Sequence, residues 1–122
     1  MSPMSRALTG EHLSFHLADL VAELRRDDNY VRSGRAGRTL VKAGALRLTL
    51  TVLAGDAEVE THHAATPMTL QVLAGRLSYR VGGETFELGA GQVLFFGPGH
   101  AQDIRALEQT ALLLTITGED DA

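Results

Sequence analysis

The pattern that decides the fold lies in residues 70–96, LQVLAGRLSYRVGGETFELGAGQVLFF. Short runs that alternate apolar and polar side chains are separated here by glycine-containing breaks. Alternation with a period of two is typical of β-strands, and a Gly-Gly pair favours a tight hairpin because both turn positions accept positive φ. We therefore predict strands over residues 68–73, 76–81, 85–88 and 92–96, with the best-defined hairpin at Gly82-Gly83.

The same period continues on both sides of this stretch. In LRLTLTVL, residues 46–53, the side chains Leu48 and Leu50 fall on one face and Thr49 and Thr51 on the other. Further short runs follow at residues 58–63, 102–107 and 111–117. Eight or nine short strands at regular spacing, with no helices between them, predict an all-β sandwich or barrel.

The order of strands and turns resembles the cupin family, which are small jelly-roll barrels. The first cupin motif reads G-x5-H-x-H-x(3–4)-E-x6-G, and the second reads G-x5-P-x-G-x2-H-x3-N. Gly75 matches the last glycine of the first motif, and Gly91 matches the first glycine of the second. The resemblance covers residues ~39 to 117 and implies an all-β cupin jelly-roll, or double-stranded β-helix barrel.

The functional positions of the first motif are matched only in part. Counting back from Gly75, the glutamate position falls on Met68. The two histidine positions fall on Thr61 and His63 with the longer spacing, or on His62 and Ala64 with the shorter one. In a metal-binding cupin the two motifs would together supply three imidazoles and a carboxylate.

Strand parity favours the longer spacing. Val59 is the apolar residue of the run 58–63 and marks its inward face, which Thr61 and His63 would share. His62 would then lie on the solvent side, together with Glu58 and Glu60. A bulge at the histidines would reverse this assignment.

The second motif places its histidine on Gln102. In the following strand Ile104 marks the inward face, and simple alternation puts Gln102 and His100 on that face as well. We therefore predict a ligand pocket lined by Thr61, His63, Met68, His100 and Gln102.

Two functions follow from this set of residues. The first is a barrel that binds a small molecule without a complete metal centre, because thioether and neutral amide groups are poor substitutes for carboxylate and imidazole. The second is a metal-dependent enzyme of cupin type, an oxygenase or isomerase. Its Zn²⁺, Ni²⁺ or Fe²⁺ would be held by His63, His100 and Gln102, with His62 as a ligand if the register differs.

The N-terminal part, residues 1–38, is expected to pack on or beside the barrel. Its apolar residues predict a helix from Glu11 to Arg26 with one leucine-rich stripe. His12, His16 and Asp19 would share another face of that helix, a spacing that either binds a transition metal or belongs to a solvated surface. The arginine-rich residues 25–38 read as a loop, the barrel as residues 39–118, and residues 119–122 as an acidic tail.

Composition excludes several classes of protein. The net charge of −4 argues against sequence-independent nucleic-acid binding, which needs a cationic face. The chain has no cysteine, so disulfides and thiolate metal sites are excluded. No signal peptide or membrane span is recognisable, and we expect a cytoplasmic protein. The outward side chains of Thr69, Gln71, Leu73 and Leu113 suggest a homodimer formed through a sheet face.

Overall fold

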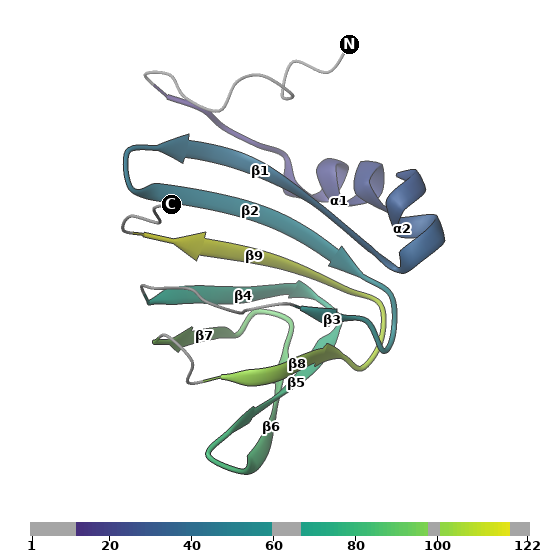
Figure 1. Cartoon of the computed structure of the whole chain (residues 1–122). Helices are drawn as coiled ribbons and strands as arrows, with labels where there is room; N and C mark the ends of the chain where they lie inside the picture. The colour runs from purple at the N-terminus through teal and green to yellow at the C-terminus, as the bar shows by residue number, and fades with distance from the viewer. Residues whose placement is uncertain (1–11, 60–66, 98–100, 118–122) are drawn as a thin grey trace.

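The computed structural model describes residues 12–59, 67–97 and 101–117. In these residues the strands form two antiparallel sheets that face each other (Figure 1). The first sheet has the order β1 (Arg35–Ala43), β2 (Leu46–Leu53), β9 (Thr110–Ile116), β4 (Met68–Ala74) and β7 (Val93–Phe96). The second has the order β3 (Glu58–Val59), β8 (Gln102–Ala106), β5 (Arg76–Val81) and β6 (Glu84–Gly89).

This architecture confirms the predicted all-β jelly-roll. Neighbours in each sheet come from distant parts of the chain, as when β9 pairs with both β2 and β4. The hairpin at Gly82-Gly83 is also confirmed, because both glycines have positive φ, +59° and +91°, and Val81 pairs with Glu84 across the turn. A two-residue turn with positive φ at both positions matches the twist of the strands that it joins.

The turn at Gly75 transfers the chain from the first sheet to the second. Gly75 lies between the last residue of β4 and the first residue of β5 and has a φ of +91°. A Cβ atom at this position would lie 2.3 Å from the carbonyl oxygen of Gln109 and 2.8 Å from the Cα of Thr110. Glycine is therefore required here for two reasons, the backbone conformation and the close approach of the segment before β9.

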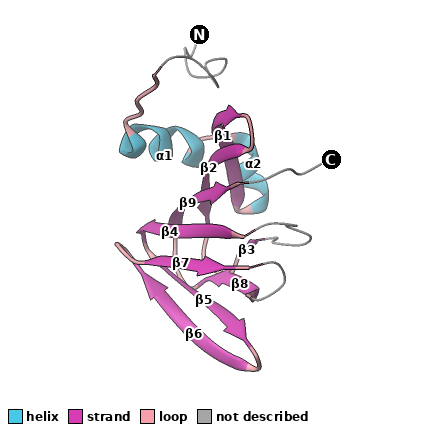
Figure 2. Cartoon of the chain, turned by 90° about the vertical axis from the view of Figure 1, so that its left-hand side faces the viewer, coloured by secondary structure: helices cyan, strands magenta, loops and turns pink. Residues whose placement is uncertain are grey.

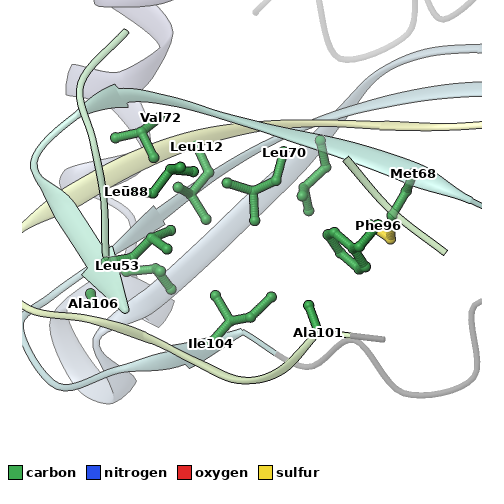
Figure 3. Close-up of a cluster of buried hydrophobic side chains, with 12 residues drawn as sticks. Leu53, Met68, Leu70, Val72, Leu88, Phe96, Ala101, Ile104, Ala106 and Leu112 are labelled. Atoms are coloured by element: carbon green, nitrogen blue, oxygen red, sulfur yellow. The ribbon is translucent and has the colours of Figure 1, made fainter. Parts of the chain in front are cut away.

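The space between the two sheets is filled by apolar side chains, which we call the inner cluster. Its members come from both sheets, and Figure 3 shows them converging on the space between the strands. Val72, Leu77 and Leu112 are among its fully buried members. The inner cluster comprises Leu53, Met68, Leu70, Val72, Leu77, Leu88, Phe96, Ala101, Ile104, Ala106, Leu112 and Leu114.

A second apolar cluster, the outer cluster, lies on the opposite face of the first sheet. It is covered by helix α1 (Leu17–Arg25), which packs on the side away from β5 and β6 (Figure 2). The helix is too short and too polar to span a membrane, as are the other helical residues that the structure describes. The outer cluster comprises Leu20, Val21, Leu24, Ala36, Leu40, Leu50, Val52 and Ala111.

The predicted N-terminal helix is shorter than the sequence indicated. Residues 12–16 are not helical, and α1 begins at Leu17 with His16 as its extended N-cap. The extended segment lets Phe15 pack against the outer cluster. His12 and His16 therefore do not share a helical face, and the metal-binding spacing proposed for them with Asp19 was wrong. The predicted start at Glu11 lies outside the described residues.

The interpretation of residues 25–38 as a loop was also wrong. This segment contains a second short helix, α2 (Asp28–Ser33), and β1 starts at Arg35. The Asp27 side chain accepts a hydrogen bond from the backbone N–H of Asn29, and Gly34 ends the helix with a φ of +79°. A helix of this length is too short to show a clear apolar period, so its capping residues are the only features of the sequence that indicate the helix.

Candidate functional site

The two ends of the barrel differ in how the strands close them. At one end, the tight turn at Gly75 packs against the start of β9, and the Thr110 hydroxyl donates to the carbonyl oxygens of Arg76 and Glu108. At the other end, which we call the Met68 end, β4 begins while β7 and β9 finish. Met68 pairs there with Phe96 on one side and Ile116 on the other.

Met68 is a packed member of the inner cluster. Its side chain is 6% exposed and lies beside Phe96, as Figure 3 shows. The resemblance to cupins puts the carboxylate ligand of a metal centre at this position. A thioether provides no charge to offset that of a divalent cation, and it is a weak ligand for the borderline metals considered above. The residue at this position therefore does not fit a complete metal centre.

The side chains of the inner cluster are all apolar. Among the described residues, Thr110 is the sole buried polar side chain, and it lies at the opposite end from Met68. The described residues also contain no group of three His, Asp or Glu side chains close enough to hold a metal ion.

The alternation used to place Gln102 breaks within β8. Asp103 has a φ of +53°, and the pairing with β5 shifts register here, since Ser78 pairs with Arg105 but Arg80 pairs with Gln102. This is a β-bulge, in which one strand contains an extra residue and the parity of its side chains changes. Ala101, which simple alternation would place on the outer face, is 2% exposed and belongs to the inner cluster.

Asp103 itself is on the outer surface of the barrel. Its carboxylate accepts a hydrogen bond from the Arg80 guanidinium at 3.0 Å, and both side chains are about half exposed. Such an exposed ion pair contributes little to stability, on the order of 0–1 kcal/mol. It does hold the two strands together next to the bulge. The side chain of Gln102 lies outside the described part of the structure.

The remaining predicted pocket residues also lie outside the described residues. Thr61, His62 and His63 fall within residues 60–66, and His100 falls within residues 98–100. One described flank of each segment lies at the Met68 end, since Met68 follows residues 60–66, Phe96 precedes residues 98–100, and the two are paired. Met68 and Phe96 are paired across β4 and β7, and Val59 pairs with Ile104 next to the start of β8.

The structure adds an aromatic pair that the sequence analysis did not single out. Tyr79 on β5 and Phe86 on β6 stack with their ring centroids 5.6 Å apart, and Tyr79 packs partly buried against the inner cluster. Tyr79 lies between Ser78 and Arg80, beside the bulge in β8. This pair could have been predicted from the hairpin at Gly82-Gly83, because the register of that hairpin places residues 79 and 86 directly opposite each other.

Comparisons with known proteins identify the fold. No protein-family model matches the chain, and no curated protein matches it in sequence. Among solved structures, a cupin superfamily protein from Desulfitobacterium hafniense is similar with a TM-score of 0.65 and 13% identity, covering 71% of this chain and 80% of its own. An RmlC-like cupin from Shewanella frigidimarina has a TM-score of 0.64 and 19% identity, covering 72% and 79%.

A longer match includes the N-terminal region. A protein of unknown function from Streptococcus pyogenes has a TM-score of 0.67 and 18% identity, and the match covers 99% of this chain and 98% of that one. At these identities the likeness concerns the fold. The chain therefore has the cupin fold, in agreement with the resemblance seen in its glycines and strands.

Proposed function

We propose that this barrel binds a small molecule at its Met68 end, without a complete metal centre. The observation that carries the proposal is the burial of Met68 in the inner cluster, at the position where a metal-binding cupin would have a carboxylate. A pocket built on such a base presents apolar walls with a few polar groups at its rim, which is the usual composition of a small-molecule site.

The polar side chains of the proposed pocket are identified from the sequence alone. Thr61, His63, His100 and Gln102 are the side chains that we propose to surround the ligand above Met68. Because the bulge breaks the alternation that placed His100 and Gln102 inward, the proposal for these two rests on the cupin motif spacing, which falls on Gln102, and on their position beside Ala101 of the inner cluster. Support for this comes from Met68 and Phe96, which adjoin the two segments and are paired across β4 and β7 at the Met68 end. The Tyr79–Phe86 pair lies on the neighbouring hairpin and supplies a further aromatic surface for a planar or apolar ligand.

The competing function is a metal-dependent oxygenase or isomerase. One observation favours it, namely that Met68 and Phe96, which adjoin the segments with His63 and His100, are paired, so that two imidazoles would be available near the Met68 end. With Gln102 they would form the atypical ligand set for Zn²⁺, Ni²⁺ or Fe²⁺, and His62 would replace His63 in the other register. The lack of a carboxylate at position 68 argues against this alternative.

We also propose that the protein forms a homodimer in the cytoplasm. The outer face of the first sheet supports the homodimer, because Val93 and Phe95 on the edge strand β7 are 56% and 65% exposed beyond the area that α1 covers. They continue the surface of Thr69, Gln71, Leu73 and Leu113. The cytoplasmic location is supported by the lack of the disulfides that stabilise many small secreted domains.

The methyl group of Met68 offers a direct test of the proposed pocket. The chain contains three methionines, of which Met1 and Met4 are near the N-terminus, so a methionine-methyl NMR spectrum is simple and Met68→Leu assigns the barrel signal. We expect several members of a fragment library to shift the Met68 signal saturably in buffer with chelator, because a preformed apolar pocket accepts small ligands.

The same experiment distinguishes the two functions. Shifts that require added Zn²⁺, Ni²⁺ or Fe²⁺ would support the metal-dependent enzyme instead. A library without any fragment that moves the Met68 signal would contradict a ligand pocket at this end of the barrel.

A further inference from the structure

A groove lies outside the barrel, between helix α1 and the outer face of the first sheet. It has a volume of about 320 Å³, at the lower end of the range for small-molecule sites. The first sheet separates it from the inner cluster, so it is independent of the pocket at the Met68 end. The groove is lined by Leu17, Ala18, Val21, Arg25, Leu73, Ala74 and Ala111.

The groove is open because small side chains form part of its sheet wall at the end of β4. Ala74 pairs with Ala111, and their methyl groups do not reach the helix as larger side chains would. Leu73 is the extra residue of a β-bulge, since Val72 pairs with Leu112 and Ala74 with Ala111. Leu73 lies on the outer face by simple alternation after the buried Val72, and it forms an apolar wall of the groove. The bulge brings the next residue, Ala74, to the same face, opposite Ala111.

Arg25 places a cationic group in this apolar surrounding. Its Nε atom is buried and has no hydrogen-bond partner among the described residues. The acidic residue nearest to it in the helix, Glu23, is already paired with Arg38 at 3.0 Å. A buried donor without an acceptor is unfavourable, and an acceptor that entered the groove would remove this penalty.

We propose that this groove binds a straight-chain monocarboxylate. The apolar chain lies along Leu17, Val21 and Leu73, and the carboxylate accepts hydrogen bonds from Arg25. The guanidinium presents Nε and a terminal nitrogen side by side, which suits the two oxygens of a carboxylate. Ala18 is exposed at the groove, so the ligand enters there without movement of the helix.

The test uses decanoate, decanol and decyltrimethylammonium as probes, each titrated below the concentration at which it forms micelles. Binding is followed by NMR on the methyl groups of Val21 and Leu73, with the Met68 methyl as the reporter for the barrel. We expect decanoate to shift Val21 and Leu73 saturably while Met68 stays in place. Decanol should bind more weakly, and the cationic probe should not bind.

Three substitutions make the test specific. Arg25→Met keeps an unbranched apolar stem but removes the guanidinium, and should weaken decanoate binding at least about tenfold, the effect of losing a charge-assisted hydrogen bond. Ala18→Leu fills the groove from an exposed position and should abolish binding. Arg26→Gln is the matched control, because Arg26 is exposed and does not line the groove, and should leave binding unchanged.

The proposal fails if Arg25→Met and Arg26→Gln have equal effects, if decanol binds as tightly as decanoate, or if Met68 rather than Leu73 reports binding. It also fails if Ala18→Leu leaves decanoate binding intact. Dissociation of a dimer by Ala18→Leu, measured by sedimentation, would assign the groove to a second copy of the chain instead. Folding of Arg25→Met is checked by its melting temperature, which should not fall because the substitution removes a buried donor that lacks a partner.

Discussion

Substitution of Gly75 by alanine is expected to destabilise the protein by roughly 4 kcal/mol or more, a large part of the roughly 5–15 kcal/mol that separates native from unfolded proteins. The new Cβ would lie 2.3 Å from the carbonyl oxygen of Gln109 and close to two atoms of Thr110, and these are mostly backbone atoms that cannot rotate away. The segment before β9 would have to move, which would also disturb the hydrogen bonds of the Thr110 hydroxyl. Urea denaturation followed by circular dichroism measures the change.

Gly91→Ala is the matched control for this prediction. Gly91 has nearly the same φ, +87° against +91°, but a Cβ at that position would meet no atom within 4 Å. Its substitution should cost only the backbone strain, roughly 1–2 kcal/mol. Equal losses at both glycines would show that Gly75 is needed for its conformation alone and that the close approach of residues 109 and 110 is unimportant.

The second large effect is expected at Leu50. Its side chain is fully buried in the outer cluster, in a sheet face that α1 covers with Leu20 and Leu24. Leu50→Ala should lower the free energy of unfolding by roughly 2–5 kcal/mol, because it removes buried methyl groups and leaves a cavity between sheet and helix. The loss is measured by the same urea denaturation.

Thr49→Ala is the control for Leu50 because it changes the adjacent residue of the same strand. Thr49 lies on the other face of β2, where it pairs with Thr39 on β1, and its side chain is only half-buried. The expected loss is less than about 1 kcal/mol, the span of strand propensities. Similar losses from the two substitutions would mean that the alternation in β2 does not separate a buried face from a more open one.

The strands could be predicted because their signal is local. Alternation in LRLTLTVL gives the two faces of β2, and the Gly-Gly pair gives both the hairpin and its register. The sequence alone did not indicate which face of β2 looks into the barrel. Both faces of β2 carry buried leucines, because Leu50 packs under α1 and Leu53 belongs to the inner cluster. Which face lies toward the barrel depends on the face on which the helix packs.

Short and irregular features escaped prediction for a related reason. Helix α2 spans six residues and depends on the Asp27 cap and on Gly34, not on an apolar stripe. The bulge at Asp103 inserts one residue into β8. The type of residue at this position does not predict a bulge. A single bulge is sufficient to reverse a parity argument, and Ala101 is the visible consequence.

The candidate site could be predicted only in part. Strand alternation predicts that Met68 faces the barrel, and its side chain is indeed buried in the inner cluster. Its role as the base of a ligand pocket stays a prediction. The aromatic pair of Tyr79 and Phe86 could have been found from the hairpin register but was missed. The positions of His63 and His100 remain predictions of the sequence, since they lie outside the described residues.

The metal content of the protein tests the central claim most directly. Protein purified without a histidine tag and dialysed into metal-free buffer is analysed by inductively coupled plasma mass spectrometry. If Met68 replaces the carboxylate of a metal centre with an apolar contact, zinc, nickel and iron should all be far below one equivalent per chain, because the remaining donors hold a cation too weakly to survive dialysis. One retained equivalent of any of these metals would contradict the proposal of a barrel that binds its ligand without a complete metal centre.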